Sequence, residues 1–202
     1  GCMLSAASCN KWLCDEILKT KDYPGEQKDI TPEKLGNNRV YFLPYLMGER
    51  SPINDTNARA TFLGMSMDTT RSDMVQAVLE GVAFAIRDSF EVAKSLGIQI
   101  QRSKVCGGGA KSPLWRQIFA NVLNLPLDIP QTEEGPGYGG AMLAMVGCGL
   151  YPSVKDCADA LVSVRETVLP DPAIAARYEK QYRNFKEIYP ALKPLFAKLQ
   201  EQ

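Results

Sequence analysis

KVCGGGAKSPLWRQIF, residues 104–119, places three consecutive glycines between a short apolar run and a run with helical spacing. Glycine loses more backbone entropy on folding than any other residue, so three in a row need a structural reason. That reason is usually a sharp turn or a close approach of the backbone to another group. Bare backbone N–H groups at the start of a helix can also face a ligand. From this stretch alone, a ligand site and a simple strand-to-helix turn both stay open.

Strands and helices alternate along the rest of the chain. The segments with strand character are residues 39–46, 60–66, 98–106 and 126–130, and those with helical spacing are 4–17, 71–97, 112–124, 137–149, 153–164 and a terminal run from 172. The polar stretch 19–38 predicts a loop with one short helical turn. This alternation predicts an α/β fold in one domain that spans residues 1–202.

The run 71–97 is the longest uninterrupted helix that the sequence predicts. Met74, Val78 and Val82 recur every four residues and indicate a broad buried face, and Gly97 is placed to end the helix. Gly81 lies in the middle of this run, where glycine costs about 1 kcal/mol relative to alanine. We therefore expect another backbone to pack tightly against Gly81.

Capping residues and prolines mark the ends of the first and last helices. Ser5 is placed to cap the first helix, and Asp171 with Pro172 is placed to begin the last one. Apolar residues of the last helix alternate steps of four and three, which is also typical of a coiled-coil seam. Pro190 and Pro194 interrupt this run, so we prefer a terminal helix that is broken once and lies on the domain.

Composition excludes several classes of function. The 23 basic and 23 acidic residues cancel, so no basic surface indicates nucleic acid as a partner. No apolar run has the length of a membrane span, and the first residues do not resemble a signal peptide. Six scattered cysteines without a CxxC pair favour reduced thiols in a cytoplasmic protein. The chain has no histidine, which excludes most zinc sites and every Ser-His or Cys-His nucleophile.

Two glycine motifs resemble phosphate-binding motifs only superficially. GGGAKS, residues 107–112, has Ala110 where a Walker loop needs a glycine directly before its lysine. GPGYGG, residues 135–140, matches GxGxxG, but it does not directly follow a strand as a dinucleotide-binding fingerprint does. Close helix packing through small side chains is the preferred interpretation of the second motif. The residues involved are Gly139, Gly140, Ala141 and Ala144.

Five blocks in a fixed order resemble one protein family. They are YFLPYLMGERSP (41–52), ARATFLGMS (58–66), AVLEGVAFAIRDSFE (77–91), GGGAKSPLWRQIFANVLNLPL (107–127) and GYGGAMLAMVGCG (137–149). Together they resemble the C-terminal domain of the FGGY carbohydrate kinases, and within that family the kinases that act on D-xylulose. The resemblance extends over nearly the whole chain.

The resemblance implies an actin-like, ribonuclease-H-like ATPase domain with a mixed sheet flanked by helices. Members of the family bind ATP and a sugar in a cleft between two domains. They transfer the γ-phosphoryl group to a sugar hydroxyl with Mg²⁺, and an aspartate acts as the base. For this chain the resemblance implies an adenine nucleotide as ligand, D-xylulose as acceptor and D-xylulose 5-phosphate as product.

Positions that match the family's nucleotide side are mostly small residues. Two glycines and an alanine would let the nucleotide lie against bare backbone, a serine and a proline would border adenine and ribose, and one more glycine matches a separate nucleotide-side position. These residues are Gly108, Gly109, Ala110, Ser112, Pro113 and Gly64. A family loop matches Gly48, Glu49, Arg50 and Arg59, where a salt-bridged structural role is at least as well supported as substrate contact.

The family's first domain, which holds the catalytic aspartate and most of the sugar site, has no counterpart in the chain. We therefore interpret the chain as an excised C-terminal domain, and the resemblance assigns it no catalytic and no metal-ligating residue. We expect it to be inactive alone and to self-associate, as a homodimer, through the surface that the first domain would cover. The alternatives are a kinase of the same family that acts on glycerol, gluconate or ribulose, and a non-catalytic actin-like binding module.

Overall fold

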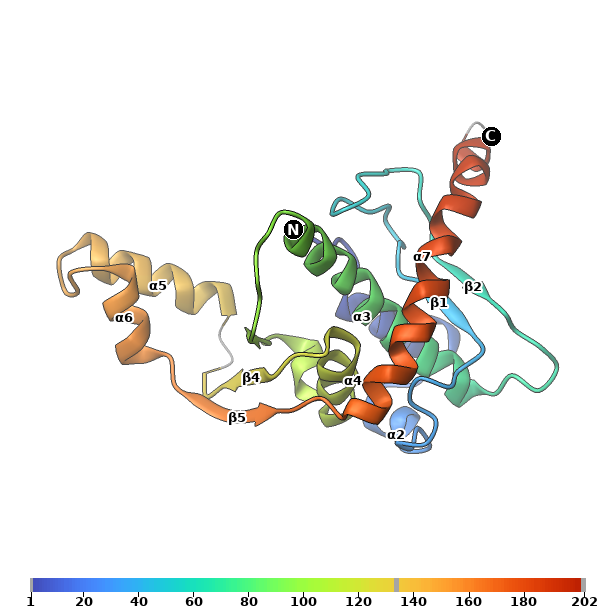
Figure 1. Ribbon diagram of the computed structural model, residues 1–202, viewed down its shortest axis with the longest axis horizontal. Helices are drawn as coiled ribbons and strands as arrows, with labels where there is room; N and C mark the ends of the chain where they lie inside the picture. The colour runs from blue at the N-terminus through green and yellow to red at the C-terminus, as the bar shows by residue number, and fades with distance from the viewer. Residues whose placement is uncertain (1, 133–134, 201–202) are drawn as a thin grey trace.

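Figure 1 shows the computed structural model of the chain, which describes residues 2–132 and 135–200. Packed helices and short strands form a body, and one pair of helices projects from it as an arm. The elements, in chain order, are α1 (Ala7–Trp12), the π-helix η1 (Leu13–Ile17), α2 (Tyr23–Gln27), β1 (Tyr41–Leu43), β2 (Thr61–Leu63), α3 (Arg71–Ser95), β3 (Ser103–Lys104), the 3₁₀ helix η2 (Gly108–Lys111), α4 (Pro113–Leu123), β4 (Leu127–Pro130), α5 (Gly135–Gly147), α6 (Val154–Leu161), β5 (Val164–Val168) and α7 (Pro172–Gln200).

The strands of the described residues form two small sheets. β1 and β2 pair antiparallel, with Tyr41 opposite Leu63. β4 lies between β3 and β5, parallel to the first and antiparallel to the second, so this sheet is mixed. Strands and helices alternate as the sequence predicts, and the α/β class is confirmed.

The central helix of the body is α3, which contacts α1, α2, α4, α7 and β1. Every residue from Val75 to Ala85 is buried, so this half of the helix is enclosed on all sides. Thr70 and Asp73 form a reciprocal capping box at its start. Gly97, with φ of +81°, follows its last turn and donates its N–H to the carbonyl of Lys94 at 2.9 Å. The predicted buried helix and its glycine stop are both confirmed.

Gly81 marks the closest approach between α3 and β1. A Cβ atom at this position would lie 2.1 Å from the carbonyl oxygen of Phe42, a backbone atom that cannot rotate away. Only a hydrogen atom fits between the backbones of α3 and β1 at this point. The expected tight backbone contact at the mid-helix glycine is therefore confirmed.

The first helix begins differently from the prediction. α1 starts at Ala7, its N-cap residue Ala6 offers no side-chain hydrogen bond, and the predicted cap Ser5 is fully buried. The Ser5 hydroxyl has no hydrogen-bond partner among the described residues. The prediction of a Ser5 cap is therefore wrong, because packing against the body has buried this residue instead of leaving it at the helix entrance.

The last helix is continuous, so the predicted break is wrong. Asp171 caps it as expected by accepting N–H bonds from Ala173 at 2.8 Å and Ile174 at 3.1 Å, and Pro172 is its first residue. Pro190 and Pro194 both lie inside α7. Both prolines are exposed, so water can reach the carbonyls that they deprive of a donor, and the helix continues along the body (Figure 1).

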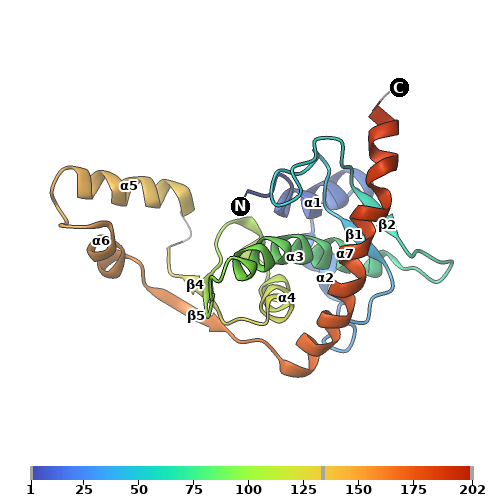
Figure 2. The ribbon, with the colours of Figure 1, turned by 45° about the horizontal axis from the view of Figure 1, so that its top comes forward.

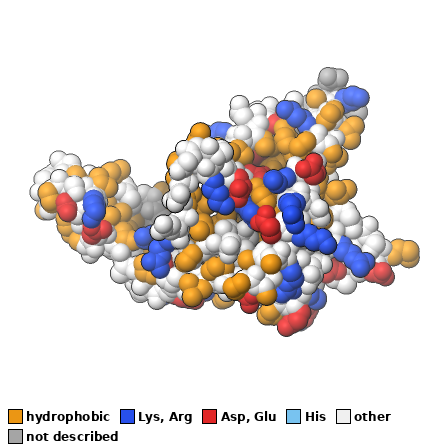
Figure 3. Space-filling view, in the orientation of Figure 1, with side chains coloured by type: hydrophobic (Ala, Val, Ile, Leu, Met, Phe, Trp, Pro, Cys, Tyr) orange, Lys and Arg blue, Asp and Glu red, His pale blue; other side chains and the backbone are white. Residues whose placement is uncertain are grey.

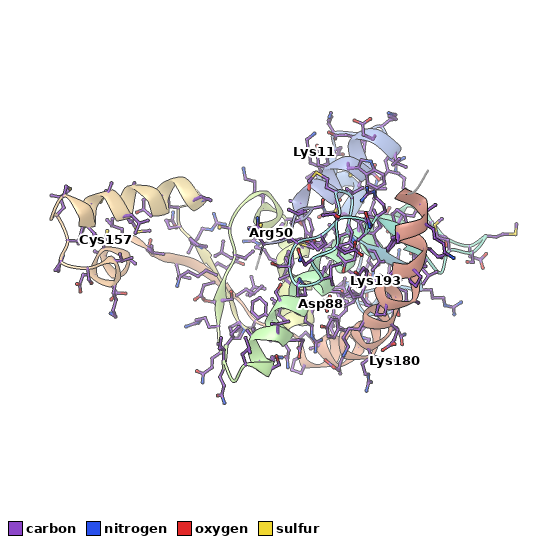
Figure 4. All side chains as sticks on the ribbon, turned by 90° about the horizontal axis from the view of Figure 1, so that it is seen from above. Lys11, Arg50, Asp88, Cys157, Lys180 and Lys193 are labelled. Atoms are coloured by element: carbon purple, nitrogen blue, oxygen red, sulfur yellow. The ribbon has the colours of Figure 1, made fainter. Side chains whose placement is uncertain are left out.

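The projecting arm consists of α5 and α6, and it differs from the prediction in two ways. A Cβ at Gly139 or Gly140 would meet nothing within 4 Å, and no residue of α5 is buried, so the predicted close packing of its small residues is wrong for this chain. Inside the arm the Tyr138 hydroxyl donates to the carbonyl of Leu161 at 3.1 Å, and the thiol of the buried Cys157 (Figure 4) donates to the carbonyl of Met142 at 3.8 Å. Figure 3 shows hydrophobic side chains over the arm, and Leu143 is 60% exposed.

The helix predicted over residues 153–164 ends early. α6 stops at Leu161, Val162 has extended backbone angles, and residues 164–168 form β5, a strand that the prediction missed. β5 pairs with β4 from Leu127 opposite Val168 to Pro130 opposite Val164. A free sheet edge therefore decided the conformation of this segment, which local spacing assigned to the helix.

Three tyrosines fasten α7 to the body by donating hydrogen bonds to carboxylates. Tyr178 donates to Glu80 at 2.8 Å, Tyr182 donates to Asp88 at 2.6 Å and Tyr189 donates to Asp55 at 2.7 Å. Asp88 is seen on α3 in Figure 4, and burial raises its pKa to about 6.

Glu80 is the most deeply buried carboxyl of these three pairs. Its Oε1 also accepts from the Gln76 amide at 2.8 Å and the Gly36 N–H at 3.4 Å. Burial raises the pKa of Glu80 to about 7, an effect that its hydrogen bonds only partly offset.

None of the described helices combines the length and the hydrophobicity that crossing a membrane requires.

Substituting Gly81 tests the contact between α3 and β1. We expect Gly81→Ala to lower the free energy of unfolding by about 1–3 kcal/mol, because the new methyl group forces α3 away from Phe42. Urea unfolding followed by circular dichroism measures this change. The matched control is Gly140→Ala, a helical position with open space around it, where stability should stay equal or rise by up to about 1 kcal/mol. Equal stability of Gly81→Ala and the parent chain would contradict the contact.

The raised pKa of Glu80 predicts a pH-dependent stability. The folded state holds this proton more tightly than the unfolded chain, whose carboxyl has the ordinary value of 4.5. Stability from this group is therefore fully present below pH 4.5 and is lost as the pH rises through 7, by about 3 kcal/mol. Glu80→Gln keeps an acceptor oxygen and does not ionise. Its free energy of unfolding, relative to that of the parent chain, should therefore rise by about 3 kcal/mol from pH 4.5 to pH 8.

Urea unfolding at both pH values measures the difference between the two chains, which cancels the other titrating groups. Glu187→Gln, at an exposed position of helix α7, is the control and should follow the parent chain at both values. A stability difference between Glu80→Gln and the parent chain that does not change with pH would show that Glu80 is ionised throughout.

Candidate functional site

A cavity of about 770 Å³ opens where α1, α2 and the start of α4 meet. Its lining comprises Ala7, Ser8, Asn10, Lys11, Tyr23, Pro24, Gln27, Lys28, Gly108, Lys111, Ser112, Pro113, Leu114 and Trp115. The volume lies in the range of pockets that enclose a small organic ligand. The glycine stretch at residues 107–109 thus borders this cavity through Gly108.

The three consecutive glycines have three different structural reasons. Gly107 has φ of +87°, a left-handed conformation that turns the chain from β3 into η2. Gly108 lines the cavity, and a Cβ there would meet only the side chain of Ala7, at 4.0 Å. Gly109 faces the ring of Trp115, which a Cβ would approach to 3.2 Å. One glycine is required by backbone conformation, one by close packing, and one leaves open space in the cavity.

Trp115 forms a rigid part of the cavity wall. Its indole N–H donates to the carbonyl of Leu79 in α3 at 2.9 Å, and its ring stacks on Phe119 with centroids 5.7 Å apart. The ring is 3% exposed, so it is fixed between α3 and the glycine stretch. The buried half of α3 thereby positions this wall.

Ser112 joins α4 to α2 at the cavity. Its hydroxyl oxygen accepts the N–H of Trp115 at 3.1 Å, which caps α4, and its O–H donates to Gln27 Oε1 at 2.6 Å. Pro113 is the first residue of α4, where its missing N–H costs no helical hydrogen bond. Both residues therefore have a helix-starting role and also line the cavity.

The short helix α2 is held in place from both ends. Tyr23 donates to Asp15 at 2.8 Å, and Asp15 also pairs with Lys21 at 2.6 Å and with Lys11. Hydrogen bonds from Lys11, Lys21 and Tyr23 hold the pKa of Asp15 well below its ordinary range. At the other end of α2, the Arg71 guanidinium binds Glu26 at 2.6 Å. These polar contacts fix the α2 wall without a hydrophobic core of its own.

The cavity combines apolar walls with a positive rim. Tyr23, Pro24, Pro113 and Leu114 contribute flat or apolar surfaces, and no acidic side chain occurs in the lining. Lys11, Lys28 and Lys111, called here the rim lysines, are exposed around the cavity, and Figure 4 shows Lys11 beside the N-terminal helices. Such a site suits a ligand with a flat apolar part and an anionic part.

The structure brings most of the sequence-predicted site residues to this cavity. Gly108, Ser112 and Pro113 line it, while Gly109 and the buried Ala110 lie directly behind the wall. Contact of these five residues with a nucleotide stays a prediction.

Gly64 does not line the cavity. It follows β2, has φ of +87°, and would place a Cβ 2.4 Å from the carbonyl oxygen of Arg39, so the hairpin alone requires a glycine there. A nucleotide-side role for Gly64 also stays a prediction.

The loop that contains Glu49 is held by backbone hydrogen bonds. Glu49 is 3% exposed, and its Oε1 accepts the N–H groups of Leu4 at 3.1 Å and Arg50 at 2.7 Å. Arg59 donates to the carbonyls of Thr56 and Ala58, each at 2.8 Å. Both side chains are therefore hydrogen-bonded to the backbone of this region, and the salt-bridged role and the substrate contact both stay predictions.

Sequence reasoning missed the part of the site that α1 and α2 contribute. Residues 19–38 look like a polar loop, and local spacing does not show that their short helix faces the glycine stretch. The small residues Ala7 and Ser8 at the start of α1 are the one local signal of open space, because they leave room opposite Gly108. Among the described residues, no three Cys, Asp or Glu side chains come together as a metal site.

Comparison with known proteins identifies relatives over most of the chain. Residues 1–148 match the C-terminal domain model of the FGGY family of carbohydrate kinases. A xylulose kinase of Staphylococcus xylosus is 33% identical over 94% of this chain. A xylulose kinase structure from Brucella ovis is 34% identical with a TM-score of 0.83 over 96% of the chain, and a gluconate kinase structure from Lactobacillus acidophilus is 27% identical with a TM-score of 0.85 over 98%.

The chain spans only about two fifths of these proteins, from 39% to 40% of their length. The likeness to solved sugar kinases confirms the predicted actin-like class of α/β fold.

Proposed function

The chain belongs to the FGGY family of carbohydrate kinases, and on this basis we propose that it is the nucleotide-binding C-terminal part of a kinase that converts D-xylulose to D-xylulose 5-phosphate. An adenine nucleotide binds in the cavity between α1, α2 and α4. The relatives with the name xylulose kinase support the choice of sugar, and the cavity supports the choice of ligand.

The open backbone at Gly108 is the observation that carries this proposal. A Cβ there would meet only Ala7, at 4.0 Å, so the fold itself does not exclude a Cβ for lack of space. The glycine instead keeps the cavity open between walls of flat and apolar side chains. A purine and its ribose fill such a space, while the rim lysines attract the phosphate groups.

The residues of this chain bind and orient the nucleotide and exclude water from its base. ATP supplies the γ-phosphoryl group when it is bound. The described residues contain no cluster of three metal-ligating side chains, so they do not fit a dedicated Mg²⁺ site, and we assign that ion mainly to the remainder of the protein. The sugar site and the catalytic base are assigned there as well. On this basis residues 1–202 form a single nucleotide-side domain of a cytoplasmic enzyme.

Other acceptors within the family remain the second candidate. The gluconate kinase from Lactobacillus acidophilus matches this chain with a TM-score of 0.85, so the fold of this domain does not distinguish the two sugars. The curated xylulose kinases, 33% identical in the case of Staphylococcus xylosus, favour xylulose.

Filling the cavity tests nucleotide binding. We expect the parent chain to bind ADP with a dissociation constant of the order of millimolar, because half of a cleft buries only part of the ligand. Gly108→Leu should weaken ADP binding at least about tenfold, since leucine occupies the cavity, while urea unfolding changes by less than about 1 kcal/mol. Titration calorimetry and amide shifts in NMR measure the binding. The matched control is Gly140→Leu on the arm, which should bind ADP normally; equal binding by Gly108→Leu would refute the site.

A chimera tests the sugar and the requirement for the remainder of the protein. This chain replaces the matching segment of the Staphylococcus xylosus xylulose kinase, and ADP release is measured with D-xylulose, gluconate and glycerol. We expect turnover with D-xylulose in the chimera, less in its Gly108→Leu variant, and none in the 202-residue chain alone. Turnover by the chain alone, or a chimera active on gluconate or glycerol only, would contradict the proposal.

A further inference from the structure

Asn10 is a buried polar side chain whose hydrogen-bonding capacity is largely unused. It lies in α1, lines the cavity and is only 7% exposed. Its Oδ1 accepts one weak bond, from the thiol of Cys14 at 3.8 Å. Its Nδ2 donates to no partner among the described residues, and this atom is not one of the fully buried unpaired side-chain atoms, so the cavity leaves it accessible. An amide donor that lines a cavity and has no protein partner is available to donate to a polar ligand atom there.

The other polar groups of the cavity explain why Asn10 is the group available to a ligand. Ser112 uses its hydroxyl fully, because it donates to Gln27 and accepts from the N–H of Trp115. Gln27 Oε1 accepts in the same contact at 2.6 Å, a much stronger bond than the thiol contact of Asn10. Asn10 presents an adjacent amide donor and acceptor, and the acceptor carries only the weak thiol contact.

We propose that Asn10 recognises the base of the bound nucleotide and selects a 6-aminopurine, an inference that rests on the proposed nucleotide site. A carboxamide presents one acceptor beside one donor. Adenine presents the complementary pair, its 6-amino donor beside a ring-nitrogen acceptor, and the two groups form a bidentate pair. Cys14 favours the orientation in which Oδ1 is the acceptor. Asn10 is thus a specificity-determining residue of the cavity.

The 6-amino group is the part of the ligand that tests this role. The probes are ADP and purine riboside 5′-diphosphate, which lacks the amino group and is otherwise the same. Each is titrated into the parent chain and into Asn10→Leu and Asn10→Ala. The parent chain should prefer ADP by about tenfold, the discrimination of one bidentate pair.

Both Asn10 variants should bind the two probes within about twofold of each other, because each has lost the bidentate pair. Asn10→Leu should be at least as stable as the parent chain, since it puts an apolar side chain of similar size at a residue that is 7% exposed, and urea unfolding verifies that both variants are folded. Lys28→Met is the matched control at the rim; it should weaken both probes by the same factor and keep their ratio.

The outcomes separate this inference from the proposed function. Loss of the tenfold preference in the two variants, with the preference kept in Lys28→Met, supports the role of Asn10. In one case ADP binds and Gly108→Leu blocks it, but the parent chain binds the two probes equally or both Asn10 variants still prefer ADP. This result overturns the inference about Asn10 and leaves the nucleotide site in place. If ADP does not bind, or binds Gly108→Leu equally well, the nucleotide site and this inference are overturned together.

Discussion

At Gly81 the backbone of α3 passes so close to the carbonyl of Phe42 that a single methyl group would not fit between them. This contact fixes the depth at which α3 enters the body, and α1, α4 and α7 all pack on the helix so placed. Leu79, two residues earlier, offers its carbonyl to the indole of Trp115. The wall behind the glycine stretch is therefore positioned by the same close approach that orders the core.

Enclosing α3 on all sides also buries polar side chains, and these form hydrogen bonds between the elements that pack on the helix. Gln76 donates to the carbonyl of Lys34 at 2.9 Å and to Glu80 at 2.8 Å, while Glu80 accepts from Tyr178 of α7. Each bond satisfies a group that would otherwise be costly to bury. The result is a polar seam that joins α3, α7 and the loop before β1, with a carboxyl whose pKa of about 7 reflects its burial.

The cavity differs from this core in its lining. Its position depends on α3, but the side chains around it leave space unfilled and hydrogen-bonding groups unused. Gly108 leaves volume unfilled, and the Asn10 amide in the cavity lining has no protein acceptor for its N–H groups among the described residues. Features of this kind are tolerated where a ligand completes the structure. Membership of a carbohydrate kinase family and a cavity with a positive rim both agree with an adenine nucleotide as that ligand.

The sequence by itself determined the features that depend on neighbouring residues and on shared motifs. Helical spacing and Gly97 defined α3, Asp171 and Pro172 defined the start of α7, and the five ordered blocks identified the family and the side of the cavity around Gly108. The tertiary structure alone decided the features that depend on contacts distant in the chain. β5 is a strand because β4 offers an edge, α7 continues through Pro190 because that proline faces water, and Asn10 belongs to the cavity because α1 packs opposite η2. Local propensity contains no information about such partners, since each is more than twenty residues away or is the solvent itself.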